Sequence, residues 1–89
     1  SLADLANSVL PGARPVIRPR ETRPAAAGWT LRSTEVSFDS VKLSDLARFL
    51  ARAGEARPPW RPVELNVSAS EQAAGSARAS VVLEALEKR

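Results

Sequence analysis

Apolar residues along this chain change between helical and strand-like spacing, in the order helix, strand, strand, helix, strand, strand. Residues 2–10 carry apolar side chains three and four positions apart before a Pro-Gly pair, which predicts a first helix. Residues 43–53 repeat this spacing, with Ser44 as the expected N-cap and Gly54 as the expected residue just after the helix. The expected apolar stripe of this second helix is Leu43, Leu46, Ala47, Phe49, Leu50 and Ala53, with Leu46 and Leu50 in the core.

Four segments have the composition and alternation of strands, namely residues 13–20, 29–38, 60–69 and 77–86. The second breaks its alternation, and a β-bulge near residues 33–35 would turn its large apolar side chains inward. These side chains are Trp29, Leu31, Val36 and Phe38. The third strand is expected to be half-buried, because apolar and polar residues alternate along it. Its expected inward residues are Val63, Leu65, Val67 and Ala69.

The positions of the prolines predict which strands lie at the edges of a sheet, because proline removes a backbone donor. A ferredoxin-like fold circularly permuted to αββαββ has its second and fourth strands in the middle, so the expected strand order is 3-4-2-1. The prolines agree with this order, because Pro15 and Pro19 fall in the first strand and Pro62 in the third. We therefore expect one α+β domain over residues 1–89, with a four-stranded antiparallel sheet and both helices on one face. Its two αββ halves are residues 1–38 and 39–89. The expected solvent-facing residues are Thr30, Arg32, Thr34, Asn66, Ser68, Arg78 and Ser80.

Cysteine and histidine are both absent, which removes disulfides, thiolate nucleophiles and the commonest metal ligand. The carboxylates are isolated along the chain, so we predict no catalytic, cofactor or metal site and no enzymatic activity. The isolated carboxylates are Glu35, Asp39, Asp45, Glu64, Glu84 and Glu87. No apolar run is long enough to span a bilayer. The first residue is Ser1, within a helical pattern, which favours a fragment or a processed product.

The chain resembles the periplasmic domain of protein M of type II secretion systems, and its relative in type IV pilus assembly, the platform protein O. The resemblance is carried by the αββαββ order, by residues 44–53 (SDLARFLARA) leading into the third strand, and by the closing strand SARASVVLEAL. The chain departs from the pattern in its arginine- and proline-rich first strand. The resemblance implies a bacterial inner-membrane protein whose tether lies outside this chain. It also implies a platform module that pairs with itself or with the L-type partner, as a homodimer or heterodimer.

The third strand is the expected partner-binding site, because proline occurs only near its beginning and leaves a regular edge for strand addition. The residues of this site are Val63, Glu64, Leu65, Asn66, Val67 and Ser68. The competing interpretation is that Glu64 and the following hairpin loop keep this edge monomeric.

An alternative function is nucleic-acid binding through the basic stretch from Arg14 to Arg23. Ferredoxin-like sheets bind RNA through exposed aromatic side chains on central strands. Here Trp29 and Phe38 are both expected in the core, so this function is predicted to be the weaker candidate. The basic residues would then serve to discourage unwanted strand pairing.

Overall fold

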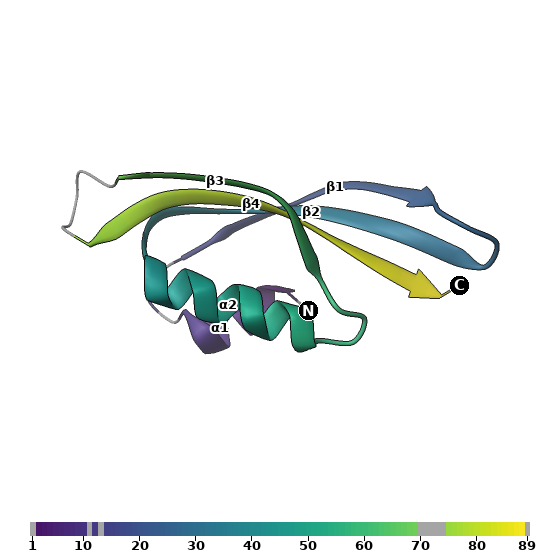
Figure 1. Ribbon diagram of the computed structural model, residues 1–89, viewed down its shortest axis with the longest axis horizontal. Helices are drawn as coiled ribbons and strands as arrows, with labels where there is room; N and C mark the ends of the chain where they lie inside the picture. The colour runs from purple at the N-terminus through teal and green to yellow at the C-terminus, as the bar shows by residue number, and fades with distance from the viewer. Residues whose placement is uncertain (1, 11, 13, 70–74, 89) are drawn as a thin grey trace.

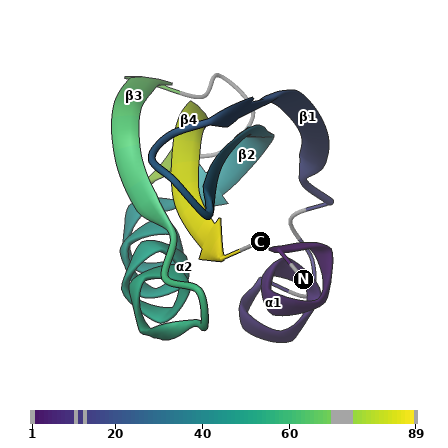
Figure 2. The same cartoon turned by 90° about the vertical axis from the view of Figure 1, so that its right-hand side faces the viewer.

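The computed structural model describes residues 2–10, 12, 14–69 and 75–88. Its elements are α1 (Leu2–Val9), β1 (Val16–Pro24), β2 (Trp29–Lys42), α2 (Leu43–Glu55), β3 (Arg61–Ala69) and β4 (Ser76–Lys88). The strands form one antiparallel sheet in the order β1-β2-β4-β3, as the prolines predicted. Both helices lie on the same side of the sheet, α1 below β1 and α2 below β3 (Figures 1 and 2). The predicted α+β architecture is therefore confirmed, and the first strand does pair with the second.

The start and end of α2 differ from the prediction. Strand β2 continues to Lys42 and passes directly into the helix, so Lys42 is the N-cap and makes no side-chain capping hydrogen bond. At the other end Gly54 is still helical, and the C-cap is Ala56, whose N–H donates to the carbonyl oxygen of Ala53 at 3.3 Å. The roles predicted for Ser44 and Gly54 are therefore wrong. The chain enters the helix without an intervening loop, which places the N-cap before Ser44, and the helix continues to Glu55, past Gly54.

The core fills the space between the helices and the central strands. Phe38 of β2 and Phe49 of α2 are fully buried, with ring centroids 6.0 Å apart in an edge-to-face arrangement at 78°. Leu46 and Ala53 are buried beside them, whereas Leu50 is only partly buried and Leu43 and Ala47 are exposed. The buried stripe consists of residues 46, 49 and 53; at 100° per residue, Leu50 lies at its border and positions 43 and 47 lie outside it.

The predicted bulge at residues 33–35 of β2 is absent. Pairing with β4 is unbroken from Trp29, opposite Lys88, to Phe38, opposite Ala79, and the irregularity follows Phe38. Because side chains alternate along an unbroken strand, Trp29 and Leu31 lie on the face away from the helices, called the open face below. The expected inward placement of these two residues is therefore wrong. The expected outward placement of Thr30, Arg32 and Thr34 is also wrong, since they share the helix-bearing face with Phe38, and Thr34 is buried.

The two edge strands are irregular at equivalent places. Register shifts occur between Pro19 and Glu21 on β1 and between Pro62 and Glu64 on β3. A proline has no N–H for the ladder, which favours a bulge at the next residue. Both bulges fall in an Arg-Pro-x-Glu sequence. One row of paired residues crosses the sheet at this level: Pro19, Thr34, Leu83 and Pro62. The register therefore places the two bulges at the same level, on either side of the central β2–β4 pair.

Candidate functional site

Strand β3 is an open edge of the sheet. All nine of its residues are exposed, including Val63, Leu65 and Val67, whose exposed fractions lie between 46% and 49%. The prediction that this strand is half-buried is therefore wrong, because only β4 flanks it and α2 covers little of its surface. Edge strands of soluble proteins present unpaired N–H and C=O groups to any strand that approaches.

From Glu64 to Ser68, the side chains of β3 alternate between the two faces of the sheet as predicted. Val67 pairs with the buried Ala79 and lies on the helix-bearing face, whereas Asn66 pairs with Ser80 on the open face. Leu65 shares the face of Val67, and Glu64 and Ser68 share that of Asn66. The site thus presents one apolar and one polar row along the same edge.

Val63 departs from this regular arrangement. The register shift between Pro62 and Glu64 leaves Val63 as the extra residue of a bulge. The regular part of the edge therefore runs over residues 64–69 and does not start at residue 63. Residues 70–74, which include part of the following hairpin loop, lie outside the described residues.

The opposite edge, β1, differs chemically from β3. It contains Pro19 and Pro24, and its exposed arginines include Arg18, Arg20 and Arg23. Arg18 is opposite Glu35 on the open face, and Arg20 is the extra residue of the bulge. The basic stretch therefore has a carboxylate, Glu35, opposite Arg18 and a bulge at Arg20. Prolines and charges of this kind protect an edge strand from pairing.

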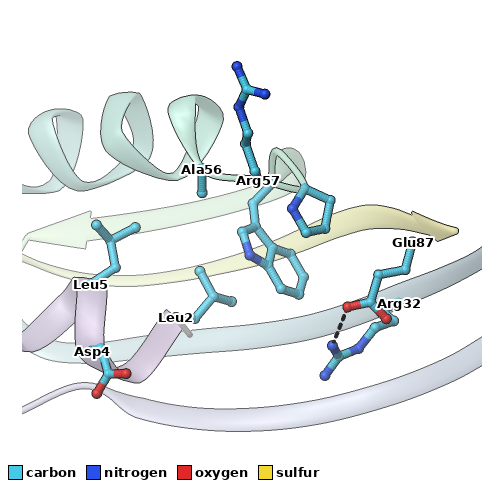
Figure 3. A pocket seen from close by; sticks show the side chains of 9 residues that line it. Leu2, Asp4, Leu5, Arg32, Ala56, Arg57 and Glu87 are labelled. Atoms are coloured by element: carbon cyan, nitrogen blue, oxygen red, sulfur yellow. Dashed lines mark hydrogen bonds and ion pairs between the residues drawn. The ribbon is translucent and has the colours of Figure 1, made fainter.

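A cavity of about 530 Å³ opens between α1, the segment after α2 and the sheet (Figure 3). Its lining includes Leu2, Leu5 and Trp60, and Arg32 Nη1 donates to Glu87 Oε1 at 3.0 Å across β2 and β4. Arg57 extends away from this pair in Figure 3. Nothing in the sequence links Arg32 to Glu87, which are 55 positions apart. Sequence reasoning treated Glu87 as isolated and missed the pair.

The carboxylates singled out in the sequence do not converge. On α2, Asp45 Oδ1 lies 3.7 Å from Arg48 Nη1, and Glu87 pairs with Arg32 as described. Both pairs are substantially exposed, so each contributes little to stability. Within the described ranges, no group of three or more Asp or Glu side chains is placed to hold a metal ion. The carboxylates with described partners therefore act in surface ion pairs.

Comparison with known proteins does not identify the chain. A scan against models of known protein families gives no match, and a search of curated proteins gives no significant match. Among the helices that the structure describes, none is long and apolar enough to cross a membrane. The function proposed below therefore rests on the fold and on the two edge strands of the sheet, β1 and β3.

Proposed function

We propose that this chain is a non-enzymatic protein–protein interaction module that binds its partner through the β3 edge. The observation that carries the proposal is the exposure of all nine β3 residues, together with the half-exposed apolar side chains of Val63, Leu65 and Val67. Strand addition uses such an edge, because the partner completes the backbone hydrogen bonds and its side chains cover the apolar row. Only Glu64 places a charge in the regular part of this edge.

We also propose that the fold is ferredoxin-like, circularly permuted to αββαββ. Moving β4 to the front of the chain turns the element order into βαββαβ, and the order β1-β2-β4-β3 supports this assignment. The equivalent Arg-Pro-x-Glu bulges, at Pro19 and Pro62, support two related halves. With the sequence resemblance, these features favour the periplasmic domain of a protein M of type II secretion, or of a pilus platform protein O. The membrane tether would lie outside this chain.

The geometry of β3 favours a second copy, or a homologous domain such as the L-type partner. In an antiparallel pair with Leu65 opposite its counterpart, Glu64 faces Asn66, and Val67 lies beside the exposed bulge residue Val63. Apolar side chains then meet apolar ones, and no like charges are opposed. A shift by two residues would instead place Glu64 opposite Glu64, which is unfavourable. We therefore propose the register centred on Leu65.

Sedimentation equilibrium of the wild-type chain and two lysine variants tests this interface. Leu65→Lys and Val67→Lys place a charge in the apolar row and should reduce association by about tenfold or more, because the ammonium would lose its water on pairing. Val16→Lys is the matched control, since Val16 is an exposed valine on the opposite edge. Circular dichroism would show that all variants remain folded.

Two results would contradict the proposal. In the first, the wild type associates, and either the β3 variants leave this association unchanged or Val16→Lys weakens it equally. The other is a wild type that stays monomeric and also fails to bind the periplasmic domain of an L-type partner. The proposal would then lack a partner for the edge on which it depends.

Nucleic-acid binding is a second candidate, and one observation favours it. Trp29 is exposed on the open face of a central strand, not buried as expected, and Arg23 lies in the adjacent row opposite Leu31. An exposed aromatic ring beside arginine can stack on an unpaired base. A saturable complex with single-stranded oligonucleotide at ~150 mM salt, weakening steeply as salt rises, would favour this function over the first.

A further inference from the structure

The C-terminal end of β4 has a second unpaired edge, separate from β3. Strand β4 pairs with β2 as far as Lys88, opposite Trp29. On its other side, pairing with β3 begins only at Glu84, opposite Arg61. Figure 1 shows why, since β3 turns away from the sheet toward α2 before it reaches the end of β4. Residues 85–88 of β4 therefore have a neighbouring strand on one side only.

A cavity of about 520 Å³ lies beside this free edge, and we call the edge and the cavity together the β4 notch. Most of its wall is apolar. Trp29 and Leu86 are 41% and 48% exposed, and Leu31 is paired with Leu86 across the two strands. The lining residues are Trp29, Leu31, Gly54, Pro59, Trp60, Arg61, Glu84 and Leu86. Large apolar side chains gathered beside a free strand edge are typical of a peptide-binding surface.

The charges around the β4 notch are mainly positive. Lys88 is opposite Trp29, Arg23 is opposite Leu31, and Arg61 is opposite Glu84. The rows that contain Trp29, Leu31 and Leu86 therefore carry two cations, Lys88 and Arg23, and no carboxylate. The next row pairs Arg61 with Glu84 and also contains Glu21. Complementary charge steers binding and suppresses wrong partners, so this surface favours a segment that carries carboxylates.

We propose that the β4 notch binds an extended peptide segment of a partner protein, with apolar side chains flanked by acidic residues. The segment adds a short strand to residues 85–88, where the backbone groups directed away from β2 are free to pair. Its apolar side chains cover Trp29, Leu31 and Leu86, and its carboxylates lie near Arg61 and Lys88. Of β3, the notch uses only Arg61, which lies outside the regular edge over residues 64–69, so either proposal can fail without the other.

The test uses a fluorescein-labelled, end-blocked hexapeptide of alternating valine and threonine with aspartate at both ends. Its control is the same peptide with lysine at both ends. Fluorescence anisotropy with the wild-type chain should show saturable binding of the acidic peptide, about tenfold tighter than that of the basic one. In amide NMR spectra, the acidic peptide should shift the signals of residues 85–88 more than those of β3.

The matched variants are Leu86→Glu and Val16→Glu, which place the same charge on exposed apolar positions of the open face. Leu86→Glu should weaken acidic-peptide binding by about tenfold or more, whereas Val16→Glu should leave it unchanged. Self-association through β3 should be unaffected by Leu86→Glu, which separates this result from the test of the β3 edge.

Several results would overturn the proposal. These are absence of saturable binding by the acidic peptide, equal binding of the basic peptide, and binding that Leu86→Glu does not weaken. Amide shifts confined to β3 would assign the peptide to the other edge. Binding of a single-stranded oligonucleotide that depends on Leu86, with no binding of the acidic peptide, would assign the notch to nucleic acid.

Discussion

Truncation of Phe49 tests whether the aromatic contact between α2 and β2 dominates the core. Phe49 is fully buried and its ring meets the ring of Phe38 edge to face at 6.0 Å. Replacing a buried phenylalanine by alanine costs about 3–5 kcal/mol, because apolar contact is lost and a cavity remains. The edge-to-face contact contributes about 0.5–1.5 kcal/mol of this. We therefore expect Phe49→Ala to reduce the free energy of unfolding by about 4 kcal/mol.

This loss is large for a domain of 89 residues. Domains of ordinary stability unfold with about 5–15 kcal/mol, so Phe49→Ala should remove between a quarter and most of the total. Leu50→Ala should cost about 1–2 kcal/mol, below the usual range for a buried leucine, because Leu50 is only partly buried. Leu43→Ala, at an exposed position of the same helix, should stay within about 0.5 kcal/mol of wild type.

Urea denaturation followed by tryptophan fluorescence and circular dichroism measures these differences. Coincident transitions and an unchanged dependence on urea would justify the comparison of free energies. A double-mutant cycle with Phe38→Leu and Phe49→Leu isolates the ring contact from the rest of the burial. A loss below about 1 kcal/mol for Phe49→Ala, or an equal loss for Leu43→Ala, would refute the assignment of the buried helix face.

Two further predictions concern the backbone. Ser44→Ala should change the free energy of unfolding by less than about 0.5 kcal/mol, because Lys42 and not Ser44 occupies the N-cap. Urea denaturation measures this change. A loss near 1–2 kcal/mol would show that Ser44 does cap the helix. Gly28→Ala should cost about 1 kcal/mol or more, because the turn before β2 holds Gly28 at a φ of 80°. The control is Gly54→Ala, at a helical position without a positive φ, which should not destabilise the domain. Equal losses of thermal stability for the two variants would show that the turn imposes no strain.

The sequence determined the element order and the order of the strands. Helical and strand-like spacing are properties of neighbouring residues, so they can be read without knowledge of the fold. The strand order was also predictable, because Pro19 and Pro62 exclude their strands from the centre of the sheet whatever packs around them. The Arg-Pro-x-Glu repeat at these prolines was present in the sequence and could have located both bulges.

The tertiary structure alone decided which face each residue of β2 occupies and how exposed β3 is. Trp29 and Leu31 lie on the open face because the β2–β4 ladder continues without a bulge, and a single shift in register would exchange the faces. The exposure of Leu65 and the cavity beside Leu86 depend on where α2 and the start of β3 lie, which no local pattern records. Alternation shows which residues share a face, but burial depends on the neighbours that cover that face, and these come from distant parts of the chain.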